Sequence, residues 1–99
     1  MNYKDPKKVL SPKDAISKVD VIYDGGENSI SIAKIIWNGE EVIGMRWNVA
    51  MREWHNKEKI AGKQCLGMPT SSGHSVWFVV PNDFFDRNSD LWKEIESKL

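Results

Sequence analysis

The chain has 99 residues, of which 40% are hydrophobic and 28% are charged. This length allows one domain with a single core, and this composition is too apolar for an intrinsically disordered protein. Basic and acidic residues each number 14, so the net charge of zero gives no general attraction to nucleic acid or to a membrane surface. The chain also lacks a run of about 18 apolar residues, as a membrane span needs, and its polar start lacks the apolar region of a signal peptide.

The N-terminal part begins a single domain that we expect to cover residues 1–99, with residues 1–10 loosely held. Ser11 and Pro12 have the form of a helix N-cap followed by proline at the first helical position. A short helix is therefore predicted from Pro12 to about Val19. The β-branched and aromatic residues 21–23 then predict a brief strand, which a turn ends.

The clearest predicted element is a β-hairpin over residues 29–48. Asn38-Gly39 is typical of a two-residue type I′ turn, and it lies between SISIAKIIW and EEVIGMRWN. This turn fixes the register of the two strands, and counting outward places Ile30 opposite Trp47.

The two faces of this hairpin differ, although neither is fully polar. The first carries most of the large apolar side chains, and we predict that it forms the core. The second groups Ile35, Trp37 and Val42 near the turn, where a solvated face would carry polar residues. Either a helix of the same chain or a second subunit could cover this second face, and we favour the subunit. With residues from other elements, the predicted core contains Ile30, Ile32, Met45, Trp47, Trp77, Val79 and Ile95.

The second half of the chain predicts a helical turn near residues 50–54, an exposed charged loop over 56–63 and a buried strand over 75–80. Pro81 ends that strand, because it cannot donate the next ladder hydrogen bond.

The final segment, SDLWKEIESKL, is typical of an amphipathic helix with Ser89 as its N-cap. Its apolar stripe indicates a helix that packs on the sheet. The predicted fold class is therefore α+β: a small, mainly antiparallel sheet with a short N-terminal helix and a C-terminal amphipathic helix packed on it.

Of all stretches in the chain, TSSGHSVWFVVP (residues 70–81) looks most like a catalytic loop. Nucleophilic catalysis needs a base held in space beside the nucleophile, and the nearness of Ser72 and His74 in sequence does not supply that. A turn is favoured, since serine and glycine are good turn residues. Cys65 beside a histidine could be a reactive couple, but a lone cysteine is more often a small buried hydrophobe. No catalytic residue, metal or cofactor is predicted.

The chain has five tryptophans, and Arg46 lies with Trp37 on the second hairpin face, which suggests a binding groove instead. We expect this groove to be lined by Trp37, Arg46, Trp54 and His74. The resulting hypothesis is a non-enzymatic binding or adaptor module that forms a homo-oligomer, with a dimer favoured, and takes a small molecule or a protein segment in the groove.

Two alternatives remain open at this stage. A single-stranded nucleic-acid binder could stack bases on Trp37 and Trp54, with Lys34 and Arg46 beside the backbone. A small hydrolase or ribonuclease could use His55 and His74, with Glu53 and Arg46, as acid, base and phosphate clamp. The nucleic-acid binder predicts an affinity that falls steeply with salt, whereas the hydrolase predicts a turnover that is lost on His74→Ala or Cys65→Ala.

Two short stretches, IGMRWN (residues 43–48) and GMPTSSGHSVWFVVP (residues 67–81), carry a family resemblance. The chain resembles small cargo proteins of bacterial mobile elements, especially those of integron gene cassettes, over about residues 29–81. In these an Arg-Trp-Asn strand precedes a Pro-x-Ser-x-Gly loop and a Trp-Phe strand. The resemblance implies a compact, self-associating protein and transfers no site residues.

The single cysteine favours a reducing, cytoplasmic setting.

Overall fold

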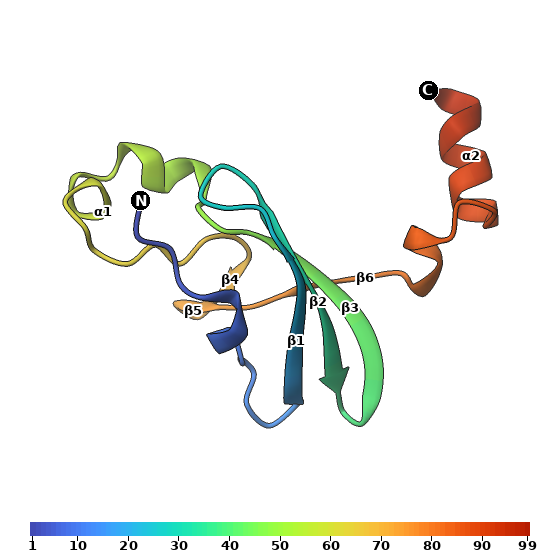
Figure 1. The fold of residues 1–99 in the computed structure, drawn as a ribbon, viewed down its shortest axis with the longest axis horizontal. Helices are drawn as coiled ribbons and strands as arrows, with labels where there is room; N and C mark the ends of the chain where they lie inside the picture. The colour runs from blue at the N-terminus through green and yellow to red at the C-terminus, as the bar shows by residue number, and fades with distance from the viewer.

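The computed structural model describes residues Met1 to Leu99 and confirms an α+β fold with a mainly antiparallel sheet (Figure 1). The main sheet has the strand order β1-β2-β3-β6, and every neighbouring pair in it is antiparallel. Its strands are β1 (Ile16–Asp24), β2 (Ile30–Trp37), β3 (Glu40–Trp47) and β6 (Phe78–Val80), and a separate hairpin consists of β4 (Thr70–Ser71) and β5 (His74–Ser75). The helical elements are η1 (Pro6–Lys8), η2 (Met51–His55), α1 (Lys57–Ile60), η3 (Asn82–Phe85) and α2 (Asp90–Lys98). None of these helices has the length and apolar character needed to cross a membrane.

The predicted hairpin is confirmed in its register. Ile30 pairs with Trp47, and the strands stay in step to the turn. Asn38 and Gly39 have φ angles of 50° and 82°, which are the left-handed conformations that a type I′ turn requires.

The predicted N-terminal helix was wrong. No helix spans Pro12 to Val19, because β1 begins at Ile16 and its β-branched residues pair along most of β2. Within the first ten residues, Val9 is fully buried and its carbonyl accepts a hydrogen bond of 2.8 Å from Trp77 Nε1. Long-range contacts of this kind leave no local signal in the sequence.

The core lies on the second hairpin face, so the predicted choice of face was wrong. Its buried cluster consists of Val9, Ile16, Ala33, Ile35 and Trp77. We call this side of the sheet the covered face. Small residues make it suitable for close packing, because a Cβ added at Gly44 would lie only 2.6 Å from Ile35 Cδ1 and 3.0 Å from Trp77 Cβ.

The predicted core list is corrected accordingly. Trp77 alone among its seven members is buried, whereas Val79 is 38% exposed and Trp47 49% exposed. The remaining four are partly exposed: Ile30, Ile32, Met45 and Ile95. The second face also needs no second subunit to cover it, because Val9 and Trp77 of the same chain lie there.

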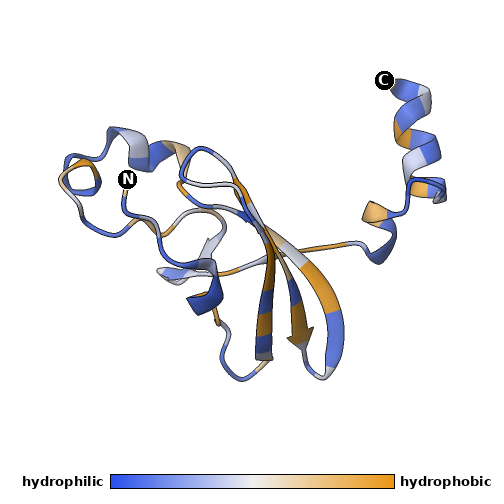
Figure 2. Ribbon diagram, viewed as in Figure 1, coloured by the Kyte–Doolittle hydropathy of each residue, from blue (hydrophilic) through white to orange (hydrophobic).

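The opposite side of the sheet, which we call the open face, carries large apolar side chains on all four strands. Strand alternation and register place these residues together. None of the helical elements makes its main contacts with this face. Figure 2 shows the hydrophobic segments of the strands at a distance from the C-terminal helix. The same register places Lys34, Glu41 and the buried Val80 on this side of the sheet. The apolar side chains of the open face are those of Tyr23, Ile30, Ile32, Ile36, Ile43, Met45, Trp47 and Phe78.

Helix α2 forms as predicted, with the Ser89 side chain accepting a hydrogen bond of 3.3 Å from Trp92 N. It does not pack on the sheet, however, and its main contacts are with η3 (Figure 1). The radius of gyration of 15.0 Å exceeds the roughly 13 Å of a compact chain of this length. An apolar stripe indicates that a helix needs an apolar partner, but it does not identify the partner.

Candidate functional site

The four residues of the predicted groove do not form one site. Trp37 and His74 line the same cavity, beside the N-terminal segment. Arg46 borders a second cavity and Trp54 a third, both on other parts of the surface. Each therefore has to be considered with its own neighbours.

Arg46 has a structural role on the covered face and is not free to bind a ligand. It is 4% exposed, and its guanidinium donates hydrogen bonds to the backbone carbonyls of Leu66 and Val76, with a longer one of 3.4 Å to Pro69. The guanidinium also lies 6.0 Å from the centroid of the Trp77 ring. Burial lowers the pKa of Arg46 to about 10, against the opposing effect of Glu53, so the side chain remains a cation at neutral pH. Arg46 thus links β3 by hydrogen bonds to the segment that contains Leu66 and Val76.

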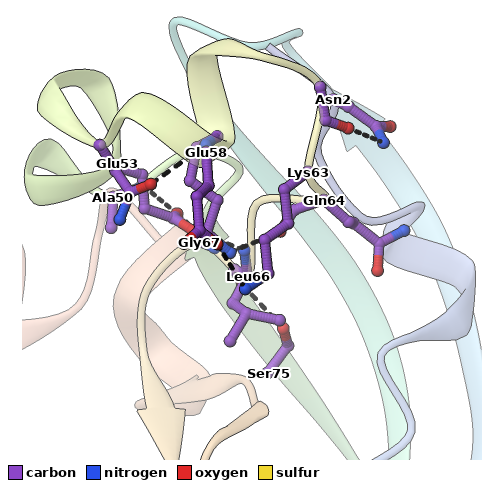
Figure 3. Close-up of polar contacts among 12 residues, drawn as sticks. Asn2, Ala50, Glu53, Glu58, Lys63, Gln64, Leu66, Gly67 and Ser75 are labelled. Atoms are coloured by element: carbon purple, nitrogen blue, oxygen red, sulfur yellow. Dashed lines mark hydrogen bonds and ion pairs between the residues drawn. The ribbon is translucent and has the colours of Figure 1, made fainter.

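Glu53 provides the matching anion on η2 (Figure 3). One of its oxygens accepts from the backbone N–H groups of Ala50 and Gly67, both at 2.9 Å, and the other accepts from Leu66 N at 2.8 Å. Burial alone would raise the pKa of Glu53, but these donors and Lys59, 3.5 Å away, outweigh it and lower the pKa. A carboxylate held in this way is structural, since its lone pairs are already used.

The TSSGH stretch is a tight hairpin. Ser71 pairs with His74, and Ser72 and Gly73 form the two-residue turn with φ angles of 49° and 78°. Both Ser72 and His74 are exposed, and no hydrogen bond joins their side chains. The residues therefore serve the turn and not an activated nucleophile.

Cys65 is fully buried, and its backbone pairs with the N-terminal segment. Burial, followed by the nearby charge of Glu53, raises the pKa of the Cys65 thiol. The thiol is thus held in its unreactive, protonated form. His55 lies on η2 and is exposed, and no three side chains of the His, Cys, Asp or Glu type are grouped for a metal ion.

The cavity beside Trp37 and His74 is broad and basic. Its volume is about 1100 Å³, and no acidic residue lines it. Its cationic lining comes from Lys4, Lys8 and Lys13, and Trp37 and Trp77 are its aromatic lining residues. We call it the lysine groove, and its chemistry fits an anion with a flat ring.

The open face has two cavities at its Trp47 end, with volumes of about 270 and 300 Å³. Trp47 and Met68 line both, so the cavities meet around these two side chains. Phe78, which is 59% exposed, borders the second cavity and Trp54 the first. Exposed apolar surface of this kind is typical of a protein-interaction site.

Sequence reasoning considered Glu53 only as a catalytic residue, and it missed two other parts of these sites. The structural role of Glu53 could have been identified from its position three residues after Ala50, where an N-terminal glutamate commonly accepts from the helix start. Met68 and Phe78 gave no such signal, because their places depend on how the segment between β3 and β6 crosses the sheet. Comparison of the chain with models of protein families, with curated proteins and with solved structures found no match.

Proposed function

We propose that this protein is a non-enzymatic binding module that self-associates and engages protein surfaces through its open face. One observation carries the proposal: apolar side chains line one side of the sheet from Tyr23 on β1 to Phe78 on β6, with Asp20, Lys34 and Glu41 between them, and no helical element makes its main contacts there. Soluble monomers rarely leave a large apolar surface uncovered, because its burial is favourable by about 25 cal/mol per Å².

The side chains that could have served catalysis support a binding function. Arg46 and Glu53 are buried among backbone hydrogen bonds, Cys65 is buried with a raised pKa, and Ser72 belongs to a turn. The resemblance to integron cassette proteins agrees with a self-associating module. We propose that it works in the cytoplasm, where a free cysteine such as Cys65 stays reduced.

The indole signals of the five tryptophans test this proposal by NMR. Trp47 is half-exposed on the open face, whereas the Trp77 indole is bonded to Val9 O in the core. In a dilution series we expect the Trp47 indole signal to shift or broaden as concentration rises, with Trp77 unchanged as the internal control. A Trp47 signal that is constant at every concentration, in a protein that stays monomeric, would contradict self-association through the open face.

The lysine groove supports a second candidate function, the binding of single-stranded nucleic acid. The groove is lined by three lysines and no acidic residue, which gives it a local positive charge that the zero net charge conceals, and Trp37 supplies a stacking face. A labelled oligonucleotide should then bind with an affinity that falls steeply with salt, and Lys8→Glu should weaken binding. Salt-independent or absent binding would leave the groove without this function.

A further inference from the structure

The C-terminal unit of η3 and α2 carries a second apolar surface that is only partly covered. Its stripe contains Leu91, Trp92 and Ile95, which are half-buried, and Leu99 at the end of the chain is almost fully exposed. The chain thus displays an apolar sheet face and an amphipathic helix whose main contacts are with η3 and not with the sheet (Figure 1). Each has the surface that the other needs.

The unit is held together by contacts among its own residues. Trp92 Nε1 donates to Phe84 O, and the two rings lie 5.7 Å apart. Arg87 lies 4.9 Å from the Trp92 ring centroid and forms a 2.8 Å salt bridge with Glu96. Ser89 Oγ donates to Asp83 O at 3.1 Å. These contacts fix the direction of α2 relative to η3.

The connection to the sheet is short. Pro81, with extended φ and ψ angles of −56° and 142°, stands between the last residue of β6 and η3. Because β6 lies at the edge of the sheet beside β3, the chain leaves the sheet there and α2 points outward (Figure 1). The extents of 45 × 35 × 22 Å reflect this projecting arm. A projecting arm and an open receiving face on one chain are the two components of an exchanged dimer.

We propose that two copies of this chain exchange their C-terminal units, so that α2 of each copy packs its apolar stripe on the open face of the other. This inference rests on the proposed function and names the occupant of the open face as a second copy. A nine-residue helix is only about 14 Å long, so one such contact is small. A two-fold exchange makes the contact twice and brings the total closer to the roughly 1,600 Å² of a stable interface.

Cross-linking between defined positions tests the exchange in the full chain. One copy carries Ile95→Cys, in the apolar stripe, and a mass-tagged second copy carries Ile43→Cys, on the open face. The native Cys65 is buried and stays silent. After the copies are unfolded, mixed and refolded, a short bismaleimide should join them into a covalent heterodimer. The matched control is Ser97→Cys in place of Ile95→Cys, since Ser97 lies on the opposite side of α2 and should give at least several-fold less product.

A chain that carries both cysteines separates the possible results. An intramolecular cross-link in a monomer would mean that α2 folds back on its own sheet, which overturns the exchange and also the free open face of the proposed function. If neither cross-link forms but the Trp47 indole still responds to concentration, the exchange is overturned and the proposed function stands. Interchain product together with a doubled native mass supports the exchange.

Discussion

Replacing one carboxylate oxygen of Glu53 by an amide nitrogen tests how much the hydrogen bonds of this side chain stabilise the protein. In a Glu53→Gln variant the retained oxygen can still accept from Ala50 and Gly67, but the new amide nitrogen faces the Leu66 N–H group, so two donors meet. A lost hydrogen bond to a charged group is worth about 1.5–3 kcal/mol, and an unpaired buried donor costs about 1–3 kcal/mol. Since the two effects overlap, we expect the free energy of unfolding to fall by about 2–4 kcal/mol.

Urea and thermal unfolding followed by circular dichroism measure this loss. A domain of this size loses about 4–8 °C of melting temperature per kcal/mol, so the expected drop is roughly 10–30 °C. Glu58→Gln is the matched control, because Glu58 is exposed and pairs only with exposed Lys63 and should unfold like the wild type. If Glu53→Gln and Glu58→Gln unfold together, the structural account of Glu53 is wrong.

The Glu53→Gln variant also tests how the stability of the protein depends on pH. The pKa of Glu53 lies below its usual value of 4.5, because its backbone donors outweigh the effect of burial. A carboxylate with a lowered folded pKa stabilises the protein above its unfolded pKa, and this contribution is lost as the pH falls through the folded pKa. Wild-type protein should therefore lose more stability below pH 4.5 than Glu53→Gln does. Parallel losses for the two proteins would refute the reasoning.

Four further predictions concern individual positions. Arg46→Met leaves the Val76 carbonyl without its donor and removes one of the two donors to Leu66 O, and each lost bond to the charged guanidinium is worth about 1.5–3 kcal/mol, so urea unfolding should show a loss of roughly 2–4 kcal/mol. Gly44→Ala places a Cβ against Ile35 and should cost about 1–3 kcal/mol, measured as a lower melting temperature. Ser72→Asn should stabilise the left-handed turn by about 0.5–1 kcal/mol, and a lower melting temperature would contradict the turn role. Because burial raises the pKa of Cys65, a thiol reagent at pH 8 should label it far more slowly in folded than in urea-unfolded protein, and equal rates would place the thiol at the surface.

The parts of the fold that local chemistry specifies could be predicted from the sequence. Asn38-Gly39 fixes one turn and therefore a whole register, so the pairing of Ile30 with Trp47 followed by counting. The Ser89 cap likewise marked the start of α2. In both cases the information lies within a few residues.

The choice between two apolar faces could not be made in the same way. The first face has the larger side chains, yet the covering layer lies on the face with Gly44 and Ala33, because small residues allow Trp77 to approach the sheet closely. The position of Trp77 depends in turn on Val9, which is 68 residues away in the sequence. Contacts at this separation follow from the assembled fold.

The four residues of the predicted groove lie apart in the structure for a related reason. Trp37 and Arg46 both lie on the covered face, as alternation predicted, but neighbouring segments bury Arg46 and leave Trp37 at the edge of the lysine groove. Trp54 and His74 lie in segments whose placement local sequence does not determine. The open face was recognised as apolar, but it was assigned to the core.

Sedimentation equilibrium of the wild type and two variants tests most directly whether the open face carries self-association. Met45→Lys places a charge at the centre of the open face, and Lys13→Glu changes an exposed residue of the lysine groove as the control. We predict that wild type and Lys13→Glu sediment at twice the chain mass of 11.4 kDa, and that Met45→Lys sediments as a folded monomer. A wild-type monomer at every concentration, or a Met45→Lys dimer as stable as the wild type, would contradict the account.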